Sequence, residues 1–155
     1  MKNIAFYAGS FDPFTNGHLE LVKQASFIFD SIIIGIGINP QKERRFLKEE
    51  MKTAIEETLK EEKLNKCKVV IYETFTYQAA KDNDSSILIR GLRNETDYLY
   101  EEEIAKYNDQ YGINTIYLRA RENGNLSSSF VYQELISGKD ISTYVPKHVK
   151  QLILK

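Results

Sequence analysis

The residues best suited to chemistry lie near the start of the sequence, where positions 9–18 read GSFDPFTNGH. This segment follows an apolar run at residues 4–8 and leads into an amphipathic helical pattern that begins at Gly17. Free backbone N–H groups and the positive end of a helix dipole favour phosphate at such a junction, and Gly9 and Gly17 let the backbone approach it closely. The two glycines alone would also suit an ordinary turn. Between a strand and a helix they predict an anion site.

His18 is the side chain of this segment best suited to contact a bound phosphate. An imidazole N–H at a helix start can donate to a phosphate oxygen and stabilise the charge that grows when a nucleophile attacks phosphorus. The sequence has 2 histidines. The other, His148, lies in a C-terminal helical pattern with no site-like residues nearby, so we interpret it as a structural or surface residue.

Two later segments could supply the second half of a phosphate site. Arg90 and Arg93 follow the apolar run at 87–89, and two guanidinium groups there could grip phosphate oxygens; surface ion pairing is the alternative. The serine run at 127–129 precedes another helical pattern. It could combine an N-cap with hydroxyl and N–H donors, although a cap alone is the more common use of such a run.

A cationic loop follows the second apolar run. Residues 39–45 read NPQKERR and include Lys42, Arg44 and Arg45. Any of these could place positive charge beside a transferred phosphoryl group, and a solvated loop is the alternative. The sequence therefore predicts positive charge at this place and leaves open which of the three residues contacts phosphate.

Apolar runs alternate with amphipathic stretches along the chain, which predicts a doubly wound α/β fold. The runs are short, rich in β-branched residues and nearly continuous, as in parallel strands buried on both faces; they cover residues 4–8, 32–38, 69–72, 87–89 and 115–118. Helices are predicted at 17–29, 47–64, 76–81, 97–111, 127–136 and 146–154. We expect a five-stranded parallel sheet in a single domain, residues 1–155, with a ligand crevice beyond the carboxyl ends of the strands.

Composition sets the class of the protein. Of its 155 residues 42% are hydrophobic and 28% charged, and the net charge of -1 provides no field that would recruit nucleic acid or an anionic membrane. No apolar run is long enough to span a bilayer and no signal peptide is recognisable, so we expect a cytoplasmic protein. Cys67 is the single cysteine, which excludes an internal disulfide, and we interpret it as a packing residue.

The motifs resemble, in order, those of the HxGH nucleotidylyltransferase superfamily. SFDP at 10–13 and TNGH at 15–18 look like its first signature, and Thr15 in place of the first histidine is similar to the phosphopantetheine adenylyltransferases. ILIRGLR at 87–93 resembles the arginine motif of that family, and residues 97–108 resemble the helix after it. LSSS at 126–129 is similar to its Ile-Ser-Ser-Ser motif, so the resemblance runs from residue 4 to residue 146.

The resemblance implies a Rossmann-like fold and transfer of AMP from ATP to 4′-phosphopantetheine, which gives dephospho-coenzyme A and pyrophosphate by direct in-line attack. It implies catalytic roles for His18, Lys42 and Ser10 around the phosphoryl group. The matching positions that would contact ATP are Ser10, Phe11, Gly17, His18, Gly91, Arg93, Glu101, Ser127, Ser128 and Ser129. Those that would contact the acceptor are Ser10, Lys42, Phe75, Thr76, Arg90 and Asn108.

The resemblance also implies ligands and an assembly state. We expect Mg²⁺ bound mainly through ATP oxygens, with no dedicated metal site in the protein. Coenzyme A is a candidate feedback ligand. The family further implies a homo-oligomer, namely a hexamer.

Two stretches differ from the family pattern and leave alternatives open. Residues 72–77, YETFTY, are bulkier and more polar than expected around a pantetheine arm, so another phosphorylated acceptor, such as nicotinate mononucleotide or glycerol 3-phosphate, is an alternative. Residues 119–125, RARENGN, replace the usual stretch before the serines, and Leu99 stands where an acidic residue is common. A non-catalytic module that binds nucleotide or coenzyme A is the second alternative.

Overall fold

A computed structural model describes residues 2–155 and contains a five-stranded sheet in the order β3-β2-β1-β4-β5. The strands are β1 (Ile4–Gly9), β2 (Ser31–Gly37), β3 (Cys67–Tyr72), β4 (Ile87–Gly91) and β5 (Asn114–Leu118). All neighbouring strands run parallel, and Phe6 in the central β1 lies opposite both Ile33 and Leu88. This confirms the predicted doubly wound parallel sheet.

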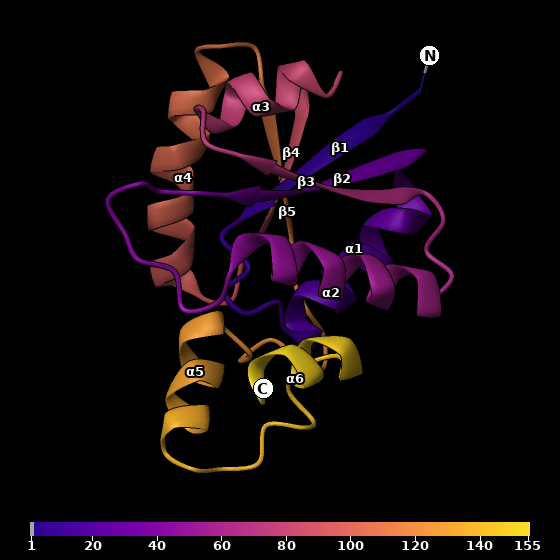
Figure 1. Cartoon of the computed structure of the whole chain (residues 1–155). Helices are drawn as coiled ribbons and strands as arrows, with labels where there is room; N and C mark the ends of the chain where they lie inside the picture. The colour runs from indigo at the N-terminus through magenta and orange to yellow at the C-terminus, as the bar shows by residue number, and fades with distance from the viewer. Residues whose placement is uncertain (1) are drawn as a thin grey trace.

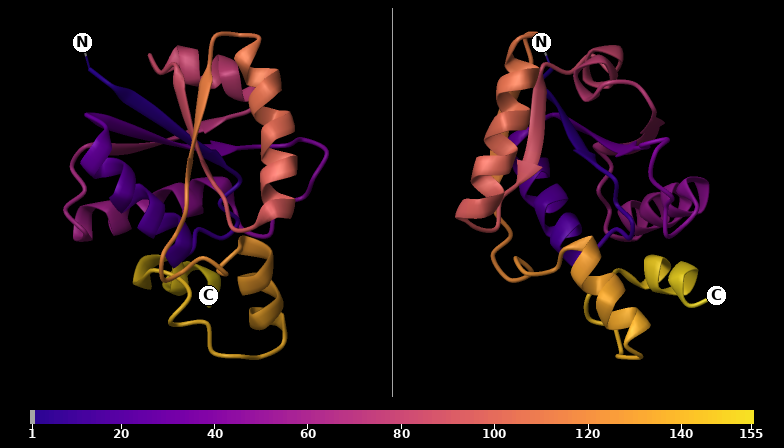
Figure 2. Two further views of the ribbon diagram at one scale, coloured as in Figure 1. Left: turned by 180° about the vertical axis from the view of Figure 1, so that it is seen from behind. Right: turned by 90° about the vertical axis from the view of Figure 1, so that its left-hand side faces the viewer.

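Helices cover both faces of the sheet (Figure 1). The chain contains α1 (Asn16–Ile28), α2 (Lys48–Glu61), α3 (Thr76–Asp82), α4 (Glu95–Asp109), α5 (Ser128–Ile136) and α6 (Lys147–Ile153). Figures 1 and 2 show α5 and α6 together at one end of the molecule, past the sheet. Within residues 2–155, no helix combines the length and the apolar character that a bilayer crossing requires.

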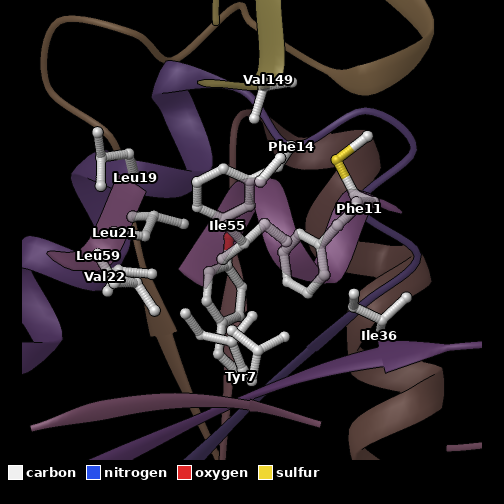
Figure 3. Close-up of a cluster of buried hydrophobic side chains, with 14 of the residues drawn as sticks. Tyr7, Phe11, Phe14, Leu19, Leu21, Val22, Ile36, Ile55, Leu59 and Val149 are labelled. Atoms are coloured by element: carbon white, nitrogen blue, oxygen red, sulfur yellow. The ribbon is translucent and has the colours of Figure 1, made fainter. Parts of the chain in front are cut away.

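Both faces of the central strands are buried, which explains their continuous apolar sequences. Ile32, Ile34 and Ile36 belong to a cluster shared with α1, α2 and α6, whereas Ile33 points to the opposite face and packs with Phe6 and residues of α3. Figure 3 shows the larger cluster, in which aromatic rings from β1 and the following loop meet aliphatic side chains of the helices. Burial on both faces is the expected environment of a parallel strand.

Most element ends lie within one or two residues of their predicted positions, and at three helix starts the difference arises because the prediction includes the N-cap residue. Leu47, Ser127 and Pro146 are N-caps with extended backbone, so each of these helices begins one residue later than predicted. β3 begins earlier than predicted, since Cys67 and Lys68 pair with β2.

The two residues interpreted as structural have structural surroundings. Cys67 packs against the larger cluster, and burial raises the pKa of its thiol to about 11. His148 Nε2 lies 2.7 Å from Glu61 Oε2 and joins α6 to α2. Both interpretations are confirmed.

The buried β2 should contribute strongly to stability. Ile34 is fully buried, whereas Ile116 in β5 is 37% exposed. Ile34→Ala should lower the free energy of unfolding by about 2–5 kcal/mol, because it removes apolar contacts and leaves a cavity. The matched change Ile116→Ala should cost about 1 kcal/mol or less. Urea unfolding followed by circular dichroism measures both values, and equal losses would contradict this assignment of the core.

Candidate active site

A cavity of about 240 Å³ lies at the carboxyl ends of β1 and β4. These strands are neighbours in the sheet, and the order of strands reverses between them, which is where open α/β sheets bind ligands. The cavity brings together most of the residues predicted from sequence: Ser10, Phe11, Gly17, His18, Arg90, Gly91, Arg93, Glu101, Ser127 and Ser128. The predicted crevice is therefore present, and both halves of the expected phosphate site line it.

Thr15 caps α1 in a reciprocal arrangement with His18. Its buried hydroxyl accepts hydrogen bonds from the backbone N–H groups of Gly17 (3.2 Å) and His18 (3.3 Å). In return, the backbone N–H of Thr15 donates to His18 Nδ1 at 2.9 Å. This is a capping box in which histidine takes the place usually held by glutamate or glutamine. The Thr15 hydroxyl also donates to Leu126 O at 2.9 Å, which fastens α1 to the segment before α5.

The first N–H groups of α1 are consequently not free for phosphate, contrary to the expectation from sequence. Thr15 takes those of Gly17 and His18, and the N–H of Asn16 donates to Tyr144 O at 2.8 Å. A buried helix start must satisfy its donors internally, and a side-chain cap does so here. Within residues 2–155, three polar side-chain atoms of this motif make no hydrogen bond, namely the acceptor Asn16 Oδ1 and the two potential donors Ser10 Oγ and His18 Nε2. The Ser10 hydroxyl and the His18 imidazole are the side-chain donors of this motif left for a ligand.

His18 is a neutral donor. Because Nδ1 accepts the Thr15 N–H, the ring proton is assigned to Nε2. Burial, together with the positive charges of Arg93 and Arg90, lowers the pKa of His18 from 6.5 to about 3. The ring is held between Phe11 (4.9 Å between centroids) and Phe14 (5.4 Å). At neutral pH this fixed imidazole donates a hydrogen bond but carries no charge.

Phe11 shapes the loop between β1 and α1. Its φ of 47° lies in the left-handed region, where a residue other than glycine is strained. The ring is buried and packs edge-on against Tyr7 at 5.1 Å. A Cβ at Gly9 would lie 3.1 Å from this ring, so Gly9 leaves room for the packing of Phe11.

Asp12 holds the cationic loop 39–45 against the first loop. Its carboxylate accepts hydrogen bonds from the backbone N–H groups of Arg45 (2.8 Å) and Phe46 (2.9 Å). The Arg44 guanidinium lies 3.6 Å from the same carboxylate and donates to Ser10 O at 2.7 Å. The loop after β2 is thereby fixed next to the cavity.

The three cationic side chains of that loop make different contacts. Arg44 is largely buried against Asp12, and Arg45 donates to Asp12 O (3.0 Å) and to Ser129 Oγ (3.3 Å). Arg45 also lies over the ring of Tyr132, 4.6 Å from its centroid. Lys42 is exposed, and its side chain makes no hydrogen bond or ion pair within residues 2–155. Lys42 is the member of the three still available to a substrate, although it does not line the cavity.

Arg90 and Glu101 bind each other in the wall of the cavity. Two parallel hydrogen bonds of 2.7 Å join the guanidinium to the carboxylate, and Arg90 Nη1 donates to Ala8 O at 2.7 Å. Arg93 pairs with Asp97 at 2.8 Å but is exposed. The ion pairing left open by the sequence is therefore present at both arginines. Arg90 links β4 to β1 and α4, whereas the exposed side chain of Arg93 pairs with Asp97 within one turn of chain.

The three serines differ in position. Ser127 is the N-cap of α5 and accepts the N–H of Phe130 at 3.0 Å. Ser128 donates to Pro13 O at 2.7 Å. Ser129 lies outside the lining of the cavity, where it accepts from Arg45. The run combines a helix cap with contacts to the first loop.

Three residues predicted to contact the acceptor also lie outside the cavity lining: Phe75, Thr76 and Asn108. Phe75 is 63% exposed and stacks on Tyr77, with ring centroids 5.6 Å apart. Thr76 Oγ1 lies 3.0 Å from the Tyr72 hydroxyl. Asn108 is buried in α4 and donates to Ile104 O at 2.9 Å. Their contacts with an acceptor stay predictions.

Several lining residues carried no clear signal in the sequence. Tyr7 lines the cavity, and burial raises the pKa of its phenol. Asn123 lines it from the stretch 119–125, which the sequence marks only as a departure from the family pattern, and Leu126 lines it from the start of the LSSS motif. Their place depends on contacts with α1 across more than one hundred residues of sequence, which no local pattern encodes.

Comparison with known proteins agrees with this geometry. The family model described as cytidylyltransferase-like matches residues 6–144. Proteins named phosphopantetheine adenylyltransferase are similar over nearly the whole chain: that of Vesicomyosocius okutanii is 36% identical and covers 99% of this chain and 98% of its own. That of Streptococcus pneumoniae is 40% identical (97% and 94% covered), and that of Leuconostoc citreum 39% (95% and 94%).

A solved structure supports the fold. A Vibrio parahaemolyticus protein with a provisional assignment as a nicotinate-nucleotide adenylyltransferase aligns with a TM-score of 0.76. The alignment covers 99% of this chain and 93% of that one, at 20% identity. The likeness at this identity concerns the arrangement of strands and helices.

The neutrality of His18 can be tested by NMR. In a His148→Gln variant His18 is the single imidazole, since the sequence has 2 histidines. Its ¹⁵N shifts should show the Nε2-protonated neutral ring and no titration from pH 8 to pH 5, because its pKa is lowered to about 3. A midpoint near pH 6.5 would contradict the assignment.

The lowered pKa of His18 also makes the stability of the fold depend on pH. Between about pH 6.5 and pH 3 the unfolded chain binds a proton at His18 that the folded chain excludes, so the free energy of unfolding falls as pH falls through this window. Above pH 6.5 the effect is absent. Urea unfolding should show a steeper loss towards pH 5 in His148→Gln than in the double variant His148→Gln/His18→Gln.

Proposed function

The chain belongs to the phosphopantetheine adenylyltransferases of the cytidylyltransferase-like family, and we propose that its cavity transfers AMP from ATP to 4′-phosphopantetheine, releasing pyrophosphate. The observation that carries the proposal is the full-length similarity to enzymes of that name. The cavity supports it, because His18, Arg93 and the start of α5 meet where the fold binds nucleotides.

The reaction requires charge stabilisation more than proton transfer. An oxygen of the acceptor phosphate attacks the α-phosphorus of ATP, a new P–O bond forms, and the bond to the pyrophosphate oxygen breaks. The nucleophile is already an anion near neutral pH, so no general base is needed. The task of the protein is to align the two phosphates and to stabilise charge on the α-phosphoryl oxygens.

The neutral imidazole of His18 suits this task. Its Nε2–H is fixed by the Thr15 hydrogen bond and needs no reorientation during the reaction, which is the property of a preorganised donor. Ser10 lines the same cavity. Lys42 supplies a mobile positive charge from a loop that Arg44 ties to Ser10. We assign these three residues to the phosphoryl group.

The rest of the cavity suits ATP. Arg93 and the start of α5 at Ser127 and Ser128 face the β and γ phosphates in this proposal. Apolar side chains, which suit a flat base, also line the cavity: Leu21, Leu92, Ala120 and Leu126. Arg90 and Glu101, bound to each other, provide a fixed polar wall instead of two separate ligand contacts.

Magnesium fits this site as a companion of ATP. Within residues 2–155, no group of three or more histidine, cysteine, aspartate or glutamate side chains is arranged to hold a metal ion. The carboxylate that lines the cavity, Glu101, is already paired with Arg90. Such a donor set suits Mg²⁺ that takes most of its ligands from phosphate oxygens and water. When bound, the ion neutralises part of the triphosphate charge.

The proposal extends to assembly, regulation and compartment. Large apolar side chains are exposed on α1 and α4, among them Phe27 (91%), Leu99 (69%) and Tyr100 (66%), which supports a homo-oligomer, and we propose the hexamer of the family. Coenzyme A, which contains the product, is the proposed feedback ligand. The cytoplasm, where ATP is made and used, is the proposed compartment.

An acceptor panel tests the reaction. With ATP and Mg²⁺, pyrophosphate should form with 4′-phosphopantetheine and stay at background with nicotinate mononucleotide and glycerol 3-phosphate. Turnover with one of the latter, and none with phosphopantetheine, would reassign the acceptor. ATP binding by calorimetry without turnover of any acceptor would instead favour a non-catalytic module.

The role of Lys42 can be separated from that of its loop. Lys42→Met removes the charge, keeps most of the side-chain length and disturbs no contact of Asp12, Arg44 or Arg45. It should lower kcat by about 10² or more, through loss of a charge that stabilises the transition state. Lys60→Met, an exposed lysine on α2, is the matched control and should leave kcat unchanged. Normal turnover by Lys42→Met would remove Lys42 from the mechanism.

A further inference from the structure

A single carboxylate on α1 holds the stretch 119–125 in place. Glu20 Oε1 accepts hydrogen bonds from the backbone N–H groups of Glu122 (3.2 Å) and Asn123 (3.1 Å) and from Asn123 Nδ2 (3.0 Å). Glu20 Oε2 accepts the backbone N–H of Arg121. Three consecutive backbone N–H groups thus converge on one side chain, as they would on a bound anion.

Charge strengthens this attachment. Burial of Glu20 opposes ionisation, but the hydrogen bonds from Arg121, Asn123 and Glu122 outweigh it and lower the pKa of the carboxyl. Hydrogen bonds to an ionised acceptor are stronger than those between neutral groups. Gln24, one turn further along α1, adds a donor bond to Arg119 O at 2.9 Å.

The attached stretch forms one wall of the active-site cavity. Ala120, Asn123, Gly124 and Leu126 line the cavity, whereas Glu20 does not. The wall lies close to α1: a Cβ at Gly17 would come within 2.8 Å of Asn123 O. Thr15 fixes one end of the wall at Leu126, and Glu20 fixes the other at residues 121–123.

Ala120 packs against the larger core cluster, but within residues 2–155 the polar residues 121–123 belong to neither core cluster. On the outer side of the wall, Glu20, Arg121 and Asn123 border a second, open groove of about 530 Å³. Its other lining residues are Asn16, Leu19, Lys23, Gln24, Phe27, Glu62 and Glu122. The wall therefore separates the active-site cavity from the open groove. Along residues 121–123, the hydrogen bonds to Glu20 are its main attachment.

We propose that Glu20 is a positioning residue for the nucleotide: by holding residues 121–123 against α1 it sets the width of the ATP side of the cavity without touching the substrate. This inference rests on the proposed function, because it takes ATP as the ligand of that wall. It also gives the unusual stretch 119–125 a role. That stretch forms a wall of the cavity, and its anchor Glu20 lies two residues after His18.

The test compares Glu20→Gln with Glu62→Gln. Glutamine keeps the shape of glutamate but removes the charge and turns an NH₂ group towards the N–H donors. Glu20→Gln should raise KM for ATP about tenfold, with KM for phosphopantetheine within about twofold; tenfold corresponds to about 1.4 kcal/mol. Glu62 borders the same groove and pairs with Lys23, so Glu62→Gln should leave both constants unchanged. Glu20→Asp, which restores the charge, should recover part of the ATP affinity.

Two readouts that need no turnover separate this inference from the proposed function. A non-hydrolysable ATP analogue should bind Glu20→Gln about tenfold more weakly in calorimetry. Amide hydrogen exchange at residues 121–123 should be faster in that variant. Equal analogue affinity and equal exchange would overturn the inference while wild-type turnover keeps the function. Equal rises in KM for both substrates would also overturn it. If Glu20→Gln does not fold, Glu20→Asp, which keeps the charge on a shorter side chain, should bind the analogue more weakly than the wild type, and equal affinity would overturn the inference.

Discussion

The buried hydroxyl of Thr15 and the N–H of the same residue fix the start of α1, and much of the site depends on them. The hydroxyl caps the helix and reaches Leu126, so one side chain joins both halves of the cavity. The N–H donates to Nδ1 of His18 and so determines which imidazole nitrogen faces a ligand. Thr15 therefore determines the cap of α1, the orientation of the His18 ring and the spacing of the two phosphate-binding segments.

The surrounding charges follow the same principle of internal pairing. Asp12 is satisfied by the backbone of the loop after β2 and by Arg44, while Glu101 is satisfied by Arg90. Buried charges are costly unless they are paired and hydrogen-bonded. Among residues 2–155, the side chains left to donate to substrate include Ser10, His18 and the exposed Arg93 and Lys42. A site with fixed donors and few competing charges suits stabilisation of a phosphoryl group.

The sequence predicted the elements and their contribution to the site well, because these are local properties. The β-branched runs gave the strands of the sheet, and the glycine-rich loop before His18 marked the start of α1 at the switch point. The sequence did not predict which distant residues contact each other. Asp12 binds Arg44 and also Arg45, which lies 33 residues later, and Glu20 holds a stretch that begins 101 residues later. The expectation of free N–H groups at α1 was wrong because the Thr15 cap uses them.

The most direct measurement is a crystal structure of the full chain with Mg²⁺ and a non-hydrolysable ATP analogue. An α-phosphate oxygen should lie within about 3 Å of His18 Nε2, with Nδ1 still bonded to the Thr15 N–H. The base should lie against Leu92 and the wall at residues 120–126. Phosphates bound away from His18, or an imidazole turned so that Nδ1 meets the phosphate, would contradict it.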